Sequence, residues 1–449
     1  MLQTRSQVLP ALSSPTTSPR RGGLVVPAAG VAALASTFAL YLANLLGHPG
    51  QQILNLLDLR LYVAAGQVAL HAPATLYGWQ FQPGMRFTYT PFAALLFAVI
   101  GHLPWAVLAW LMTGASMLAL GLAVWLTLGA LGWAGRRRLG AALAITAAGF
   151  WTEPVQRVLH WGQIDLLLMT LVVWDLCRPD SERWKGAGIG LAAGIKLVPL
   201  VFIPYLVITG RIRQAAVALA TFTALAGVGF AGLPGASAQW WFGPAFLHPG
   251  RTGFVGFVAD QSLLAMFTRE SGSVAAGTSC WLAAAAAIGV TGLTAGALWH
   301  RAGRPVYGWV TCALTGLLVS PVSWDHHWVW IVLMLPVLAD VAVRARGAAS
   351  WAGWAAAAAL AALFAAWPLR WPPAPQLPWG LIWAAPHTLG GGGGRPWGSE
   401  YHWHLAASLT GNLYLLAGLA TVGCLVAMAP AAQARDPQVW DPQVSPARR

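Results

Sequence analysis

Long apolar segments separated by short polar ones fill most of the chain. A helix needs ~20 apolar residues to cross a membrane, whereas a transmembrane β-strand needs ~10 residues that alternate. The segments here are continuous, which predicts helical spans and excludes a β-barrel. We expect about ten spans, at about 24–46, 105–132, 139–153, 162–178, 213–233, 276–298, 305–321, 327–343, 349–367 and 406–429.

Arginine and lysine gather in the short polar segments, and loops rich in these residues stay in the cytoplasm. This rule places both termini inside and makes successive spans alternate in direction. We expect a disordered cytoplasmic N-terminus at 1–23, one membrane domain at 24–429 and a disordered cytoplasmic tail at 430–449. The segment 368–405, with its glycine run at 390–394, is expected outside the membrane as a flexible loop.

Segment 186–209 departs from the pattern, because basic residues flank it on both sides and it contains Lys196, Pro199 and Pro204. If both ends are cytoplasmic, it enters and leaves by the same face, and such backbone is tolerated only where protein or a cavity covers it. We favour this re-entrant element; a single kinked span is the alternative. The apolar run 89–103 is too short to cross and is expected at the outer interface.

Composition agrees with a polytopic all-α membrane protein. The 449 residues are 57% hydrophobic and 9% charged, whereas a soluble domain has roughly 25% charged residues. The net charge of +13 belongs to the loops and does not indicate nucleic-acid binding. The four cysteines have no paired spacing, so neither a disulfide framework nor a zinc site is expected; they are Cys177, Cys280, Cys312 and Cys424.

Acidic residues are few and unevenly placed. This orientation puts seven of the 13 on or near the outer face, together with three histidines. A membrane protein that gathers ionisable groups at one face indicates a functional site there, although solvated loop residues are the alternative. The residues are Asp58, Glu153, Asp165, Asp260, Glu270, Asp325 and Glu400, with His160, His326 and His327.

Asp58 begins the first outer loop. Desolvation at a lipid–water boundary raises the proton affinity of a carboxylate, which suits a general base. Arg60 nearby opposes that shift or holds an anionic substrate, and an interfacial ion pair between the two is the alternative.

Two further polar groups interrupt apolar segments. Gln163 and Asp165 stand at the entrance of a span, where they need protein or water to face. Lys196 lies well inside 186–209 and needs an anion, a carbonyl cluster or water; snorkelling to the cytoplasm is the alternative.

The run Ser320–Trp328 contains Asp325, His326 and His327 in sequence. Adjacent side chains on a helix point about 100° apart, which disfavours a shared metal ion. A hydrogen-bonded Asp–His unit that serves a phosphate or a proton transfer is the better interpretation, with Trp324 placed to stack on a sugar ring.

In order, these motifs resemble the polyprenol-phosphate-mannose-dependent α-mannosyltransferases of glycosyltransferase family 87, in the C-type membrane superfamily. The resemblance covers roughly residues 50 to 345. The family often has asparagine at Asp165 and Asp260. The matching pieces are Asp58 with Tyr62, Tyr89-Thr-Pro91, Gly162-Gln163-Ile-Asp165, Gly190–Pro199 with Lys196, Asp260-Gln261-Ser262 and Ser320–His327.

The resemblance implies a C-type glycosyltransferase fold with an active site outside the cytoplasm, a lipid-phosphate-sugar donor, a glycolipid or glycan acceptor and inversion at the anomeric carbon. Asp58 would be the general base, with His326 and His327 as further catalytic candidates. Lys196 and Arg60 would meet the donor phosphate. The expected substrate-binding residues are Tyr62, Tyr89, Gln163, Asp165, Asp260, Gln261, Trp324 and Asp325.

This scheme requires no metal and no other cofactor, and the expected partners are the two substrates and membrane lipids. Three alternatives stay open. The donor sugar could be arabinofuranose or glucose, the chain could be a lipid transporter or flippase with broken helices, or it could be a catalytically silent relative. We expect a bacterial plasma-membrane protein.

Overall fold

The computed structural model describes residues 25–47, 55–243, 249–366, 380–385 and 399–433. The expected disordered N-terminus and the glycine run at 390–394 lie outside these ranges. So does the expected tail, apart from the last residues of the final helix, which ends at Gln433.

The first half of the chain is helical apart from one short hairpin. Its elements are α1 (Val25–Gly47), α2 (Leu57–His71), η2 (Pro73–Thr75), β1 (Gln80–Gln82), β2 (Met85–Arg86), α3 (Pro91–Ile100), α4 (Trp105–Ala130), α5 (Gly135–Phe150), α6 (Glu153–Trp161), α7 (Asp165–Cys177), α8 (Ala187–Ile195), η3 (Val198–Val201) and α9 (Phe202–Ile208). The two strands pair antiparallel, with Gln80 opposite Arg86.

The second half contains helices and no named strand among the described residues. Its elements are α10 (Ile212–Gly232), α11 (Pro234–Phe242), η5 (Pro249–Thr252), α12 (Leu263–Ser271), α13 (Val274–Arg301), α14 (Pro305–Val319), η6 (Asp325–Leu333), α15 (Met334–Arg344), α16 (Ala348–Leu363), η7 (Leu381–Trp383), η8 (Ser399–His402), α18 (Leu405–Gly411) and α19 (Leu413–Gln433).

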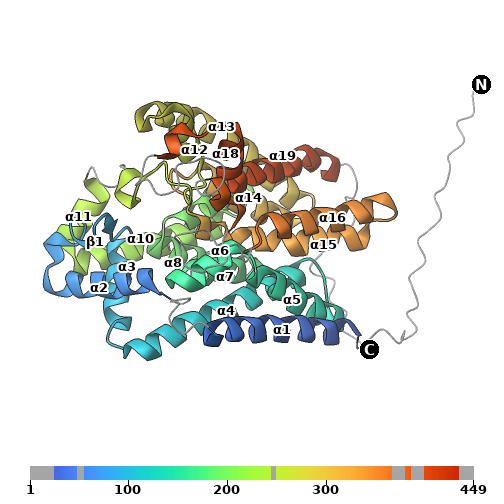
Figure 1. Cartoon of the computed structure of the whole chain (residues 1–449), viewed down its shortest axis with the longest axis horizontal. Coiled ribbons are helices and arrows are strands. Elements are labelled where there is room, and N and C mark those ends of the chain that lie inside the picture. The colour runs from blue at the N-terminus through green and yellow to red at the C-terminus, as the bar shows by residue number, and fades with distance from the viewer. Residues whose placement is uncertain (1–24, 48–54, 244–248, 367–379, 386–398, 434–449) are drawn as a thin grey trace, which may run out of the picture.

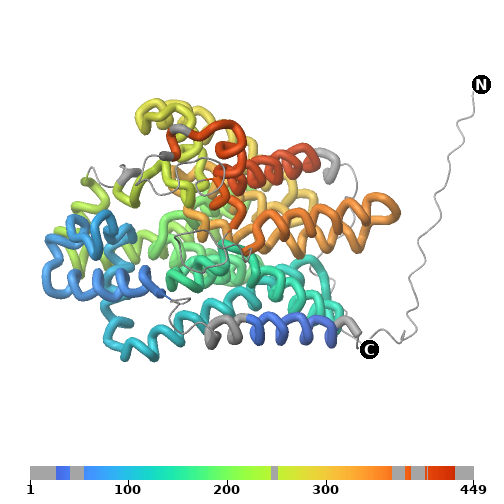
Figure 2. The backbone as a smooth tube through the Cα atoms, in the orientation of Figure 1, coloured from blue at the N-terminus to red at the C-terminus, as the bar shows by residue number. Residues whose placement is uncertain are grey.

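Short helices occupy the middle of the molecule and long ones its edges. Figure 1 shows α6, α7 and α8 at the centre, with α1 and α4 along one edge and α13 along the opposite one. Figure 2 shows α15 and α16 as a hairpin that projects from the bundle. The short central helices are therefore flanked on two sides by longer ones.

Four helical segments among the described residues are long and apolar enough to cross a membrane: α4, α10, α13 and the joined run Asp325–Arg344. The pair α18 and α19, bent by 67°, is a fifth if it counts as one span. Most of the other expected spans coincide with apolar helices of 10–17 residues. The fold is therefore that of an all-α polytopic membrane protein, and the number of ten crossings stays a prediction.

Segment 186–209 has the re-entrant form. Helix α8 ends at Ile195 and the chain turns back through η3 into α9. Its two ends meet, because the Arg213 guanidinium donates to the carbonyls of Glu182 and Arg183 and a Cβ on Gly186 would lie 2.2 Å from the carbonyl oxygen of Gln214. A straight kinked span would hold these ends apart. Asp175 on α7 accepts from the backbone N–H of Gly186 and of Ile189, which satisfies the first turn of α8.

Three regions expected as loops or interfacial segments are helices that carry the site. Asp58 lies in the first turn of α2. Helix α3 begins at Pro91 and is capped by Thr90, whose hydroxyl accepts from the N–H of Ala93. Helix α6 occupies the expected outer loop between two spans. Polar residues in these regions therefore have fixed positions on helices.

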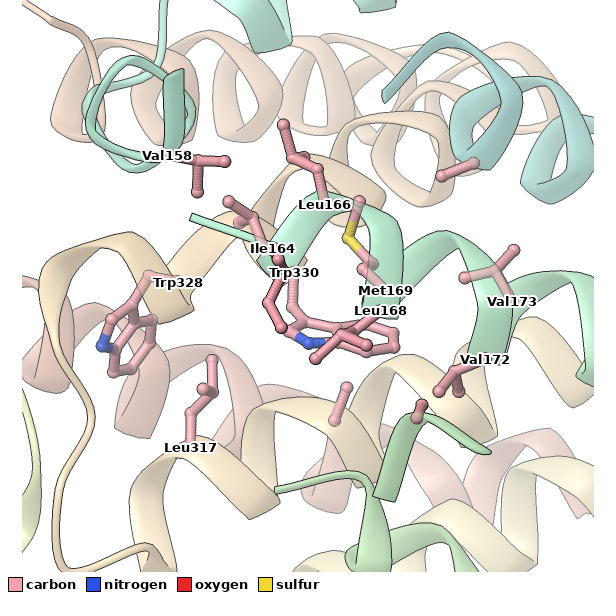
Figure 3. Packing of buried hydrophobic residues seen from close by; sticks show 14 of the residues in the cluster. Val158, Ile164, Leu166, Leu168, Met169, Val172, Val173, Leu317, Trp328 and Trp330 are labelled. Atoms are coloured by element: carbon pink, nitrogen blue, oxygen red, sulfur yellow. The ribbon is translucent and has the colours of Figure 1, made fainter. Parts of the chain in front are cut away.

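The core beneath these helices is apolar. Figure 3 shows Leu168 of α7 against the ring of Trp330 of η6, whereas Leu166 points away from that ring and Leu317 of α14 lies near Trp328. Val158, Leu166 and Trp328 are fully excluded from solvent. This packing fixes α6, α7 and η6, which carry most of the ionisable residues discussed below, relative to one another.

Candidate active site

A tight turn and a strained residue bring α2 against the start of α7. Helix α6 ends at Gly162, whose φ of 70° favours glycine. The N–H of Leu56 donates to the carbonyl of His160 at 2.7 Å. Leu56 is the only non-glycine among the described residues with a positive φ, at 50°. Such strain persists only where surrounding structure enforces it and is concentrated at functional sites. The turn at Leu56 places Asp58 beside Gln163.

Asp58 lies at one end of a buried hydrogen-bond network. The Gln163 amide nitrogen donates to Oδ2 of Asp58 at 2.7 Å. The amide oxygen accepts from the hydroxyls of Tyr62 and Tyr89, at 2.5 and 2.9 Å, and these hydroxyls lie 2.7 Å apart. An ionised carboxylate only accepts hydrogen bonds, so the NH₂ group must face Asp58. The two tyrosines therefore hold the amide in the orientation that serves the carboxylate.

Asp58 has the electrostatics of a base. Burial raises the pKa of its carboxyl to about 6, and the hydrogen bond from Gln163 and the positive charge of Lys196 oppose the shift. The residue is still partly accessible. Within the described residues only its Oδ2 is hydrogen-bonded, so Oδ1 is available to a substrate. A pKa near neutrality is the value that suits general base catalysis.

Lys196 supplies a positive charge within reach of Asp58. It follows α8 directly, and its ammonium lies 2.7 Å from Oδ1 of Asp165 at the start of α7. The ammonium also lies 5.5 Å from the centre of the Tyr89 ring. Thr90 donates to the carbonyl of Gly194, which ties α8 to α3. The snorkelling alternative for Lys196 is wrong, since its partner is a buried carboxylate at the tip of the re-entrant segment.

His326 and His327 complete this cluster. Nδ1 of His326 lies 3.2 Å from Oδ1 of Asp325, which confirms the expected Asp–His unit. The two imidazoles cross at 89° with centres 4.7 Å apart. Ligand atoms of both histidines and of Asp165 lie within 4.8 Å of one another. The expectation that adjacent histidines diverge is therefore wrong, because crossed rings bring their nitrogens together.

Those three residues could hold a metal ion by distance alone, but the charges favour an anion. The ammonium of Lys196 already occupies the side of Asp165, and a divalent cation beside it would be repelled. Within the described residues, Oδ2 of Asp165 and Nδ1 of His327 are buried without a hydrogen-bond partner. A small cavity of ≈ 20 Å³ adjoins Asp165, Lys196 and His327. It has room for about one water molecule.

A second buried network supports the histidines from behind. Arg157 of α6 lies 2.8 Å from Glu153 and 3.5 Å from Asp325. Glu153 also accepts from Trp383 at 3.0 Å and from Tyr414 at 3.2 Å. Burial and the neighbouring Asp325 raise the pKa of Glu153 to about 7. Asp325 is therefore in place to orient His326, its expected contact with substrate stays a prediction, and the solvated-loop alternative is wrong for Glu153.

Sequence reasoning missed Arg157. It is the only basic residue between Arg138 and Arg178 apart from histidine, and it stands four positions after Glu153. A helical i,i+4 ion pair was the available signal.

Arg60 does not join the cluster. It lies two positions after Asp58 on α2, about 200° around the helix, and is exposed. Its guanidinium lies over the ring of Trp105, 4.3 Å from the centre. The expectation that it meets the donor phosphate next to Asp58 is therefore not supported by the geometry.

Asp260 and Gln261 form hydrogen bonds with backbone groups of distant segments. Oδ1 of Asp260 accepts from the N–H groups of Ser262 and Ser323, at 3.2 and 2.9 Å. Gln261 donates to the carbonyls of Val258 and Gly411, both at 2.6 Å. Both side chains are fully buried and bonded to backbone groups, and their expected role in substrate binding stays a prediction. Their hydrogen bonds fix the segment that carries Asp325.

Trp324 is the one expected residue of this region that remains partly exposed. Its backbone pairs with that of Asp260 in an isolated bridge. The indole is therefore held in place with part of its surface open, which keeps the prediction of sugar stacking available.

Known proteins support the same reading of the chain. A family model described as glycosyltransferase family 87 matches residues 87–321, more than half of the sequence. The polyprenol-phosphate-mannose-dependent alpha-(1-2)-phosphatidylinositol pentamannoside mannosyltransferase of Mycobacterium tuberculosis is 32% identical over 380 residues, which cover 83% of this chain and 81% of the relative. Its namesake from Mycolicibacterium smegmatis is 32% identical over 82% of this chain and 84% of its own length.

A third relative from M. tuberculosis is named as a polyprenol-phosphate-mannose-dependent alpha-(1-2)-phosphatidylinositol mannoside mannosyltransferase. It is 32% identical over 70% of this chain and 72% of its own length. No solved structure gives a significant match. The family match and these identities show that the chain is an enzyme, and it belongs to glycosyltransferase family 87.

Proposed function

We propose that the chain transfers mannose from polyprenyl-phosphate-mannose to a hydroxyl of a phosphatidylinositol mannoside, with inversion, at the outer face of a bacterial plasma membrane. The observation that carries the proposal is the network that joins Asp58 through Gln163 to Tyr89, whose ring centre lies 5.5 Å from the ammonium of Lys196. A base and a nearby cation are what a sugar phosphate needs to react with a hydroxyl. The names of the relatives supply the donor and acceptor classes.

In the reaction, Oδ1 of Asp58 takes the proton of the acceptor hydroxyl as its oxygen attacks the anomeric carbon. The bond from that carbon to the phosphate oxygen breaks, and the phosphate leaves with the electron pair. Lys196 and His327 are placed to meet the charge that develops on the departing phosphate. General base catalysis supplies about 10²–10⁴-fold, and holding two lipids in one site supplies much of the rest.

The orientation follows from where the basic residues lie. Arg183, Lys185, Arg211 and Arg213 flank the joined ends of the re-entrant segment, while its tip carries Lys196 into the cluster. Arg301 donates to the carbonyl of Ile208 and adds to the same end. Because positive loops remain inside, this end faces the cytoplasm and the cluster faces outward. The same rule keeps both termini inside.

The test is transfer of radiolabelled mannose from polyprenyl-phosphate-mannose to a phosphatidylinositol mannoside by purified protein in nanodiscs. Asp58→Asn is assayed alongside. Label transferred by the wild type and lost in the variant supports the donor, the acceptor class and the base together. Equal transfer by both removes Asp58 as the base. Transfer only from a lipid-linked arabinofuranose or glucose overturns the donor.

A further inference from the structure

Arg251, outside the catalytic cluster, is a partly buried cation on an aromatic platform. Its guanidinium lies 3.8 Å from the centre of the Trp240 ring. Trp240 is 1% exposed and stacks on Tyr77, with ring centres 4.8 Å apart. Burial lowers the pKa of Arg251 to about 10. The guanidinium is therefore held in place and has lost part of its hydration.

Within the described residues, no carboxylate lies within ion-pair distance of Arg251. The segments outside the described ranges contain no Asp or Glu except Asp436 and Asp441 near the C-terminus. A partly desolvated guanidinium is costly unless an anion pairs with it. Among the described residues, therefore, no carboxylate serves as the counter-ion of Arg251.

The position of Arg251 is linked to the catalytic cluster but separate from it. Tyr77, beneath Trp240, donates to the carbonyl of Tyr89 at 3.0 Å, and the Tyr89 hydroxyl contacts Gln163. Element η5, which carries Arg251, packs beside β2, where Arg86 is exposed. Arg251 is thus connected to the Asp58 network through Trp240, Tyr77 and Tyr89.

We propose that Arg251, held over Trp240, binds the phosphodiester of the glycolipid acceptor, an inference that rests on the proposed function. The donor phosphate is bonded directly to the anomeric carbon, so it must sit next to the hydroxyl at Asp58 and cannot extend to a separate cation. The acceptor has its phosphodiester separated from the reacting hydroxyl by the inositol and its sugars. The donor phosphate lies close to the reacting hydroxyl and the acceptor phosphodiester lies farther from it. These two anions correspond to the two cationic sites, at Lys196 and at Arg251.

The kinetic test compares Arg251→Gln and Arg251→Lys with the wild type. Arg183→Gln is the matched control, because Arg183 also lies over an indole, that of Trp184. We expect Arg251→Gln to raise the acceptor KM about tenfold or more, as loss of a charge-assisted hydrogen bond does. The donor KM and kcat stay near wild type, and Arg251→Lys recovers part of the loss. A mannoside acceptor without the phosphodiester is used equally well by the wild type and Arg251→Gln.

Two results overturn the inference. A raised donor KM with an unchanged acceptor KM would assign Arg251 to the donor, and an unchanged acceptor KM alone would leave it without this role. Binding without donor separates the inference from the proposed function. Deacylated glycerophosphoinositol mannoside should bind the wild type and bind Arg251→Gln more weakly, whether or not mannose is transferred. Phosphatidylglycerol vesicles serve as a second probe. If Arg251→Gln weakens binding to these vesicles as much as binding to the glycerophosphoinositol mannoside, Arg251 is a general lipid-phosphate contact and the acceptor site is contradicted.

Discussion

Gln163 donates its side-chain amide to Oδ2 of Asp58 at 2.7 Å. One carboxylate oxygen is thereby occupied, while the other has no hydrogen-bond partner among the described residues. We infer that Gln163 orients the base, as Asp325 orients His326; the sugar contact expected from its position in the sequence stays a prediction.

Asp58→Asn should lower kcat by about 10²–10⁴-fold, the range that a positioned general base supplies. The amide keeps the size of the carboxyl, so the melting temperature should stay near wild type. Single-turnover transfer and thermal unfolding in the same nanodiscs measure both. A folded variant with wild-type kcat would contradict the assignment.

Activity should fall at acid pH with a midpoint near 6, the pKa to which burial raises Asp58. Below this pH the carboxyl is protonated and cannot accept a proton, so kcat/KM drops about tenfold per pH unit and reaches a plateau above it. Gln163→Met removes a hydrogen bond that favours the carboxylate, so its midpoint should move to higher pH. An unmoved midpoint with a lower plateau would leave Gln163 with a structural role only.

Lys196→Met alone should destabilise the protein by about 3–5 kcal/mol, because it leaves the Asp165 carboxylate buried and unpaired. Adding Asp165→Asn removes that charge and should restore most of the melting temperature. The folded double variant should still show a donor KM raised about tenfold or more. A wild-type donor KM in the double variant would exclude Lys196 from the phosphate site.

Asp260→Ala should lower stability without a specific effect on either substrate. Two backbone N–H groups lose their acceptor, and each unsatisfied buried donor costs about 1–3 kcal/mol. The free energy of unfolding should fall while both KM values of the folded protein stay near wild type. Unchanged stability with a raised KM would support the substrate-binding role expected from the sequence.

EDTA should leave transfer unchanged. The positive charge beside Asp165 comes from Lys196, so no step in the proposed reaction needs a divalent ion. Transfer assays with EDTA and after addition of Mg²⁺, Mn²⁺ or Zn²⁺ measure this directly. Activity lost on chelation and restored by one ion would show that Asp165, His326 and His327 bind metal.

Much of the cluster could be predicted because its members interrupt apolar segments. Asp58, Gln163 and Lys196 each stand where a polar group is costly unless it has a partner, and the sequence shows that cost directly. That these three residues lie close together could be predicted from the family resemblance and from the orientation of the spans. The re-entrant form of 186–209 was likewise visible in the basic residues at its two ends.

The departures from prediction have different physical causes. Asp260 and Gln261 bind backbone groups of Ser323 and Gly411, and no local pattern encodes that long-range pairing. Arg60 was placed beside Asp58 because the region was expected to be a loop, whereas α2 turns its side chain away. The number of spans is hard to infer for a different reason, since several central helices are shorter than a membrane is thick and are covered by neighbours.

As a re-entrant element, the hairpin formed by α8, η3 and α9 would add no crossing to the chain. A reporter fused near residue 183 and another fused near residue 210 should then be found on the same side of the membrane, although 26 residues of largely apolar sequence separate them. If 186–209 were counted as one more span, every later helix would be assigned the opposite direction across the membrane. The direction of all helices in the second half therefore depends on the turn at Lys196.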